Sequence, residues 1–246
     1  MIDLKIKNLY PLLNPAVVKI KSQNLLKPEL ANKIAYELTR DIKLVRDIHE
    51  NRDIPPFAIK NLTDNSFELH IMIPISETAL YSHAERLKIK IEEIDYPIIK
   101  IPNIHTIKQV ILNFTSPTSF RWRNSYVPYF EPFLFWKGVL NLWKRFVNFD
   151  ISEEIVDGLV IEIHPVKTDF IIERITLSEK IIIPAFKGSA VLEFSKDLSS
   201  ESKTLVLTLL ESARHTGVGV KRAWGMGNLE YQVTTEYNLA FLGSLN

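Results

Sequence analysis

Residues 217–227 read Gly-Val-Gly-Val-Lys-Arg-Ala-Trp-Gly-Met-Gly and hold four of the eight glycines in a chain of 246 residues. Glycine is required where the backbone takes a positive φ, or where another molecule must approach the backbone closely. The apolar pattern of residues 202–213 predicts a helix before this segment, and residues 229–233 have the pattern of a strand after it. The segment is therefore predicted to be a long connection from a helix to a strand.

This order of elements separates the segment from two familiar nucleotide-binding loops. A dinucleotide-binding fingerprint needs a strand before it, a helix after it and a third glycine where this chain has Arg222. A P-loop needs Gly-Lys followed by Ser or Thr, and the chain contains no such triplet. The two Gly-X-Gly pairs instead flank Lys221 and Arg222, which predicts a loop whose amides and cations bind phosphate. The alternative is a tight connection without a ligand, but the absence of acidic residues from 214 to 229 favours the phosphate site.

Outward from this loop, each half of the chain shows a similar series of elements. The hydrophobic patterns of the first half predict strands at residues 3–7, 57–59, 66–75 and 87–94, and helices at 27–39 and 44–49. Those of the second half predict strands at 108–114, 159–163, 170–177, 180–183, 188–194 and 229–233, and helices at 132–146 and 202–213. A stretch with two prolines, residues 96–107, is a candidate linker. The predicted fold class is α+β, with two tandem ferredoxin-like (RRM-like, βαββαβ) domains at residues 1–107 and 108–246.

Composition excludes several classes of protein. The chain has no cysteine, which rules out disulfide frameworks, zinc ribbons, iron–sulfur clusters and thiol nucleophiles. It has neither the pattern of a signal peptide nor a run of eighteen apolar residues, so we expect a cytoplasmic protein with no membrane contact. The net charge is only +1, but the cations are concentrated before Glu29, between Arg121 and Arg145, and in the glycine-rich loop. The near-neutral total charge therefore argues only against indiscriminate affinity for nucleic acid, and not against nucleic acid as a partner.

The glycine-rich loop resembles that of a known family. Gly-apolar-Gly, five residues that include Lys-Arg, and a second Gly-apolar-Gly before a C-terminal strand are similar to the loop of the CRISPR repeat-processing endoribonucleases, the Cas-six family of the repeat-associated RNA-binding superfamily. The sequence Phe-Thr-Ser-Pro-Thr-Ser-Phe at 114–120, with the aromatic helix after it, also resembles that family, and the likeness covers about residues 110–233. The resemblance implies ferredoxin-like domains and metal-independent cleavage of the repeat RNA in a CRISPR precursor transcript, which leaves a 2′,3′-cyclic phosphate and a 5′-hydroxyl.

The same resemblance implies a set of catalytic residues. Cleavage of this kind needs a base for the 2′-hydroxyl, an acid for the departing 5′-oxygen and cations for the charge on phosphorus. His49, in an Ile-His-Glu context ahead of a strand led by Phe57, matches the family's catalytic histidine. Tyr36 and Arg52 are the nearest matches to its additional tyrosine and basic residue. The family's usual lysine before the aromatic strand is replaced by proline, which leaves Arg52 or Lys60 to supply the cation. An exposed histidine at a helix end is the alternative for His49.

The candidate RNA-binding residues combine the loop with a cationic stretch outside it. Arg121 and Arg123 alternate with Trp122, and such mixtures of cations and aromatics are typical of grooves that bind single-stranded or hairpin RNA. The full set is Gly217, Gly219, Lys221, Arg222, Gly225, Gly227, Arg121, Arg123 and His215. His215 is also the second candidate for the catalytic histidine, with helix capping as its alternative role, and His70 is expected to be structural. No metal site or other cofactor is implied.

These observations lead to one hypothesis and two alternatives. The leading hypothesis is an endoribonuclease that binds CRISPR repeat RNA and cleaves it to give crRNA. The first alternative is a non-catalytic RNA-binding subunit of a CRISPR effector complex, built on the same folds. The second, a phosphate-ligand enzyme unrelated to RNA, is disfavoured because no carboxylate cluster with metal-binding spacing accompanies the loop. The expected partners are the repeat RNA, an effector complex and a second copy of the chain.

Overall fold

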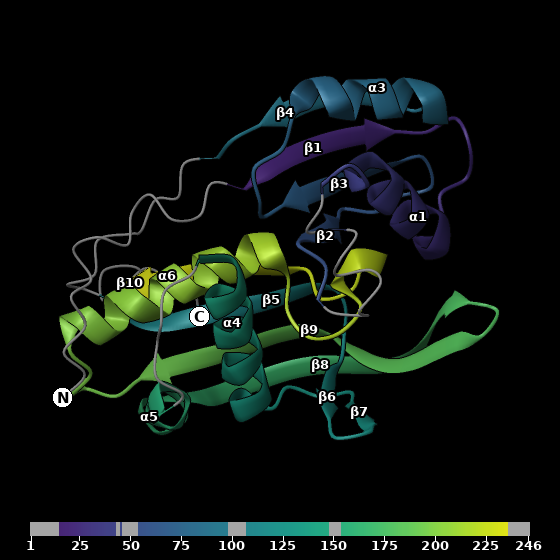
Figure 1. Cartoon of the computed structure of the whole chain (residues 1–246). Helices are drawn as coiled ribbons and strands as arrows, with labels where there is room; N and C mark the ends of the chain where they lie inside the picture. The colour runs from purple at the N-terminus through teal and green to yellow at the C-terminus, as the bar shows by residue number, and fades with distance from the viewer. Residues whose placement is uncertain (1–14, 43–44, 46–53, 98–106, 148–153, 236–246) are drawn as a thin grey trace, which may run out of the picture.

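The protein forms two four-stranded antiparallel sheets, each accompanied by helices (Figure 1). The structure is a computed structural model, and it describes residues 15–42, 45, 54–97, 107–147 and 154–235. In the described part of the chain, no helix is both long and apolar enough to cross a membrane.

The first sheet and its helices follow the βαββαβ order. The elements are β1 (Ala16–Lys21), α1 (Pro28–Thr39), β2 (Phe57–Lys60), β3 (Ser66–Ile71), α3 (Glu77–Leu87) and β4 (Lys90–Asp95). The sheet order is β2-β3-β1-β4, so the first and third strands of the unit lie at its centre. Helix α1 has a proline in its first turn, where the missing N–H has no helical partner in any case. Helix α3 begins at Ser76, whose hydroxyl oxygen accepts the N–H of Ala79.

The second sheet repeats this arrangement. Its elements are β5 (Ile107–Thr118), β6 (Phe120–Trp122), β7 (Ser125–Val127), α4 (Pro132–Val147), α5 (Glu154–Glu162), β8 (Ile163–Ser178), β9 (Ile181–Phe194), α6 (Ser200–Thr216), the 3₁₀ turn η2 (Arg222–Trp224) and β10 (Leu229–Thr235). The order β10-β5-β9-β8 is that of the first sheet, and β6 and β7 form a separate short hairpin. The predicted α+β fold of two tandem ferredoxin-like units is confirmed. The division into domains at residues 107 and 108 stays a prediction.

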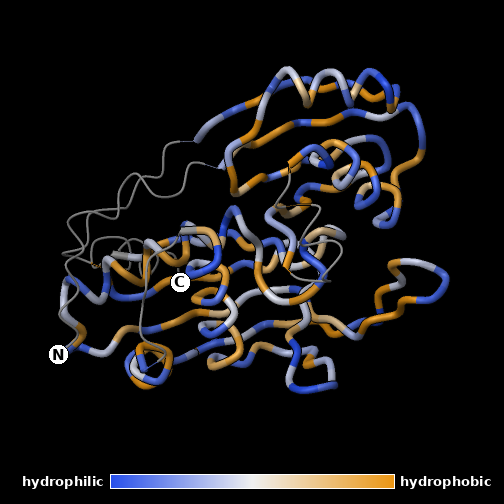
Figure 2. Tube along the Cα trace, viewed as in Figure 1, coloured by the Kyte–Doolittle hydropathy of each residue, from blue (hydrophilic) through white to orange (hydrophobic). Residues whose placement is uncertain are grey.

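The alternation of side chains along the strands gives the first sheet two faces, which pack against different parts of the chain. Phe57 and Ile59 of β2, and the alternate residues Phe67, Leu69 and Ile71 of β3, are buried in one apolar cluster with α1 and α3. The residues between them point to the opposite face, which meets the second half of the chain. In the second half, strands β8 and β9 run on beyond the rest of the sheet (Figure 1), and Figure 2 shows hydrophobic stretches on this extension.

Several predicted elements differ from the structure. The strand predicted at residues 159–163 is wrong, because residues 154–162 form α5, which buries Ile155, Val156 and Leu159 at helical spacing. The strand predicted at 87–94 begins only at Lys90, since Leu87 is the last residue of α3 and Lys88 caps that helix in a left-handed conformation.

Other differences concern the first and third strands of the two units. Two strands predicted at 180–183 and 188–194 are one continuous strand, β9. The strand predicted at 3–7 lies outside the described residues, as does the helix predicted at 44–49 apart from residue 45. The first strand of the structure, β1, was not predicted.

Candidate functional site

The glycine-rich loop, residues 217–227, connects α6 to β10 and is packed too tightly for side chains at two of its glycines. A Cβ atom on Gly219 would lie 2.3 Å from the carbonyl oxygen of Ser119, and one on Gly227 would lie 1.9 Å from that of Val218. Both residues also have positive φ angles, +70° and +74°. The fold itself therefore requires these glycines, whether or not a ligand approaches the loop.

Most of the loop's amides bind the protein rather than facing solvent. Four of these hydrogen bonds run from Gly217 N to Ala213 O, Val218 N to Gly227 O, Val220 N to Ser119 O and Gly227 N to Pro117 O, at 2.8–2.9 Å. Within the described part of the chain, the N–H groups of Gly219, Lys221, Arg222 and Ala223 have no protein acceptor. The predicted cradle of free amides is thus much smaller than the sequence suggested, because the loop uses most of its donors to hold its own shape.

Arg222 fastens the loop to the first half of the chain. Its side chain is buried, with Nη1 donating to the carbonyl oxygen of Thr216 and Nη2 to that of Pro55 at 3.4 Å. Beside it, Asn32 of α1 donates from Nδ2 to the carbonyl oxygen of Ala223 at 2.8 Å, and Ala223 joins the core of the first half. Burial lowers the pKa of Arg222 to about 10. The structure gives this residue a positioning role, while its direct contact with phosphate stays a prediction.

A cleft of about 390 Å³ opens beside the loop, between the β6–β7 hairpin and α4. Its lining includes Gly219 of the loop and the cations Arg121, Arg123, Lys137 and Arg222, and among the described residues no acidic side chain lines it. Arg121 and Arg123 are exposed, and Lys137 is half-buried. The structure therefore brings two predicted RNA-binding stretches, 121–123 and 217–227, to one positively charged cavity.

Of the three predicted catalytic residues, the structure describes only Tyr36. Tyr36 is half-buried on α1 and meets the ring of Phe57 edge-on, with 5.0 Å between centroids. Burial raises the pKa of Tyr36, and the positive charge of Arg222 opposes that rise. His49 and Arg52 lie outside the described residues. The chain re-enters the described part at Ile54, which lines the cleft.

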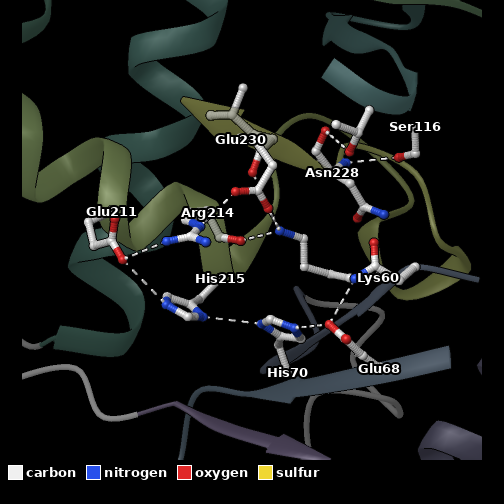
Figure 3. A network of polar contacts seen from close by, with 12 residues as sticks. Lys60, Glu68, His70, Ser116, Glu211, Arg214, His215, Asn228 and Glu230 are labelled. Atoms are coloured by element: carbon white, nitrogen blue, oxygen red, sulfur yellow. Dashed lines mark hydrogen bonds and ion pairs between the residues drawn. The ribbon is translucent and has the colours of Figure 1, made fainter. Parts of the chain in front are cut away.

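His215 belongs to a buried polar network between the two halves of the chain (Figure 3). Its Nδ1 lies 3.2 Å from Nδ1 of His70 on β3, and its Nε2 lies 3.7 Å from a carboxylate oxygen of Glu211. On the other side, Nε2 of His70 lies 3.3 Å from the carboxylate of Glu68. Both ring nitrogens of His70 are satisfied if its Nε2 donates to Glu68 and its Nδ1 accepts from Nδ1 of His215. His215 is therefore held away from the cleft lining by contacts within the protein, and its proposed contact with RNA stays a prediction.

Lys60 adds a second connection beside the histidine pair. Its buried ammonium donates to the carbonyl oxygens of Arg214 and of Leu229, the latter at 3.4 Å, and to the carboxylate of Glu230 at 3.4 Å. Arg214 in turn donates to Glu230 at 2.7 Å. Burial lowers the pKa of Lys60, and Glu230 opposes this shift. Lys60 thus serves the contact between the halves in this structure, and the sequence had offered it only as a candidate cation.

The network predicts a loss of stability in mild acid. Burial lowers the pKa of His70 to about 4, so the folded state resists a proton that the unfolded chain takes up near pH 6.5. Because the folded-state pKa is the lower one, the contribution is complete above pH 6.5 and declines as the pH falls to 4, by up to about 3 kcal/mol. Urea unfolding at pH 7.5, 6, 5 and 4.5 measures this decline. His70→Gln should flatten it, and an unchanged slope in that variant would contradict the assignment.

Sequence reasoning missed three residues that shape the site. Trp122 was considered only as a spacer between two arginines, although its side chain lines the cleft. Asn32 carried no signal, because its partner Ala223 lies 191 positions away in the sequence. Glu211 has a helical neighbour in His215, but its contact with Tyr231, 20 positions away, left no trace in the sequence. Only the clustering of cations near Trp122 offered a hint of the cleft.

Comparison with known proteins supplies the remaining observation. A family model described as CRISPR-associated endoribonuclease Cas6 matches residues 112–229. Among solved structures, a Cas6 product complex aligns with a TM-score of 0.68 at 18% identity, over 89% of this chain and 99% of that one. A Cas6 from Thermus thermophilus aligns with a TM-score of 0.66 at 16% identity, over 90% of this chain and 98% of that one. No curated protein sequence matches. At these identities the solved structures establish the shared fold.

Proposed function

We propose that the chain, whose residues 112–229 match the model of the CRISPR-associated endoribonuclease Cas6 family, is a metal-independent endoribonuclease that binds CRISPR repeat RNA and cleaves it in the precursor transcript. The observation that carries the proposal is the continuity between the predicted catalytic segment and the cationic cleft. Ile54, five positions after His49, lines the cleft, and the carbonyl oxygen of the next residue, Pro55, accepts from Arg222.

The proposed reaction is an internal displacement at phosphorus. The 2′-oxygen attacks the adjacent phosphate as its proton leaves, the bond from phosphorus to the 5′-oxygen breaks, and that oxygen takes up a proton. The products are a 2′,3′-cyclic phosphate and a 5′-hydroxyl. Proton transfer is assigned to His49, since imidazole can hold or release a proton near neutral pH. Arg52 is assigned to the developing negative charge on the phosphate oxygens.

Tyr36 is assigned a positioning contact in the same reaction. Because burial raises its pKa, the phenol stays neutral at physiological pH and can donate a hydrogen bond. The positive charge of Arg222 opposes the rise in the pKa of Tyr36, so the phenol on α1 lies within electrostatic reach of the glycine-rich loop that borders the cleft. A phosphate oxygen bound between these groups would meet donors from both halves of the chain.

Cleavage of labelled repeat RNA in excess EDTA tests this function. We expect one dominant cut and a 5′ product whose 3′ end resists enzymatic tailing until the cyclic phosphate is opened and removed. Tight binding without any cut would favour the non-catalytic subunit of an effector complex instead. Cleavage that EDTA abolishes would contradict the metal-independent mechanism, so EDTA-treated protein supplemented with Mg²⁺ or Mn²⁺ completes the comparison.

A further inference from the structure

We propose that the cleft between the β6–β7 hairpin and α4 binds one unpaired nucleotide, with its base stacked on Trp122 and its phosphate held by the surrounding cations. The inference rests on the proposed function for the presence of RNA, and it adds the kind of RNA element that this part of the protein recognises. A single unpaired nucleotide differs from a duplex in offering a free base face to an aromatic ring.

Trp122 of β6 is exposed to solvent, whereas the two tryptophans of α4 are buried. Its side chain is 48% exposed, whereas Trp136 and Trp143 of α4 are 0% and 2% exposed. Leaving an indole in water forfeits the free energy that burial would provide. An exposed ring that lines a cavity with cations around it is therefore available to stack against a flat ligand.

The ring of Trp122 packs against an aromatic residue of α4. The indole meets the ring of Phe133 edge-on, with centroids 6.1 Å apart and planes at 78°. The hairpin behind it is closed by a two-residue turn, because Trp122 pairs with Ser125 and Arg123 takes a positive φ of +53°. An aromatic platform fixed in this way loses little side-chain entropy when a base stacks on it.

The cations around Trp122 are placed for a phosphate beside that base. Phe133 also lies under the ammonium of Lys137, whose Nζ is 5.3 Å from the ring centroid. The same phenyl ring thus orients both the stacking platform and a phosphate cation. Arg121 also lines the cleft, and the unpaired N–H of Gly219 adds a backbone donor at its border.

The size and lining of the cleft match one nucleotide. Its volume of about 390 Å³ lies at the lower end of the range for small-molecule sites, roughly 300–1,000 Å³. Asn141, one helical turn after Lys137, lines the same cavity and offers both a donor and an acceptor to a base edge. A duplex would present phosphates to the arginines but no base face to Trp122.

Binding of an uncleavable repeat RNA tests the inference. The RNA carries a 2′-deoxynucleotide at the cut site, and its dissociation constant is measured at fixed salt. Stacking contributes a factor of roughly 5 to 160 per base, so Trp122→Leu should weaken binding by that factor and Trp122→Phe by much less. Tyr81→Leu, at a residue that is 50% exposed on α3, is the matched control and should leave the affinity unchanged. Equal affinities of Trp122→Leu and the unmodified protein would overturn the proposal.

A scan with single abasic nucleotides then locates the stacked base. At one position, removal of the base should weaken binding by the same factor as Trp122→Leu, and the two changes together should cost no more than either alone. Fully additive losses at every position would refute the stack. The result is independent of catalysis: a protein that stacks the base but never cuts would contradict the endoribonuclease function alone, and cleavage with no role for Trp122 would contradict this inference alone.

Discussion

Replacing His49 with alanine is expected to lower the rate of repeat cleavage by about 10²- to 10⁴-fold, the usual contribution of a positioned general acid or base. Binding of the uncleavable repeat should change little, because the cations and Trp122 that are proposed to hold the RNA remain. Single-turnover cleavage with protein in excess measures the chemical step, and a binding titration of the same variant measures affinity.

The matched control for this substitution is His164→Ala. His164 lies on β8, is exposed, and is not among the residues that line the cleft. Its loss should leave both cleavage and binding unchanged. If His49→Ala cleaves at the original rate, the histidine assignment is wrong, and His215→Ala becomes the next variant. If His49→Ala and His215→Ala both lose cleavage, the buried His215 acts instead by keeping the two halves of the chain together.

The fold was predictable because ferredoxin-like topology leaves a regular trace in the sequence. Alternating residues in β3 and in β9, and the helical spacing of α6, survive in the linear pattern. Short elements gave weaker signals. Residues 159–163 alternate as a strand would, but packing of Leu159 with Ile155 and Val156 decides for a helix, and no local pattern records that packing.

The site was predictable in composition rather than in arrangement. The glycine-rich loop and the cations near Trp122 stood out in the sequence, and the structure shows them around one cleft. Arg222 was expected to be a free cation, yet it is buried and bonded to Thr216 and Pro55. Its acceptors are carbonyl groups, one of them 167 positions away, and backbone acceptors of this kind leave no mark on residue type.

The second large effect is expected from Gly227→Ala, which should lower the free energy of unfolding by about 2–5 kcal/mol and weaken RNA binding with it. An alanine there must adopt a φ of +74°, which costs about 1–3 kcal/mol for a residue other than glycine. Its Cβ would also lie 1.9 Å from the carbonyl oxygen of Val218, so the backbone has to shift. That shift breaks the hydrogen bond from Val218 N to Gly227 O, which closes the loop.

Gly138→Ala is the matched glycine control. Gly138 lies within α4, and a Cβ built on it meets nothing within 4 Å. The same chemical change should there raise stability by up to about 1 kcal/mol, because alanine is the better helix former. Thermal unfolding followed by circular dichroism compares the two variants. For a chain of this size, each kcal/mol of stability is expected to shift the melting temperature by about 2–4 °C. Equal melting temperatures for Gly227→Ala and the unmodified protein would mean that the loop does not need its left-handed glycine, and that the close approach of residue 227 to Val218 does not contribute to stability.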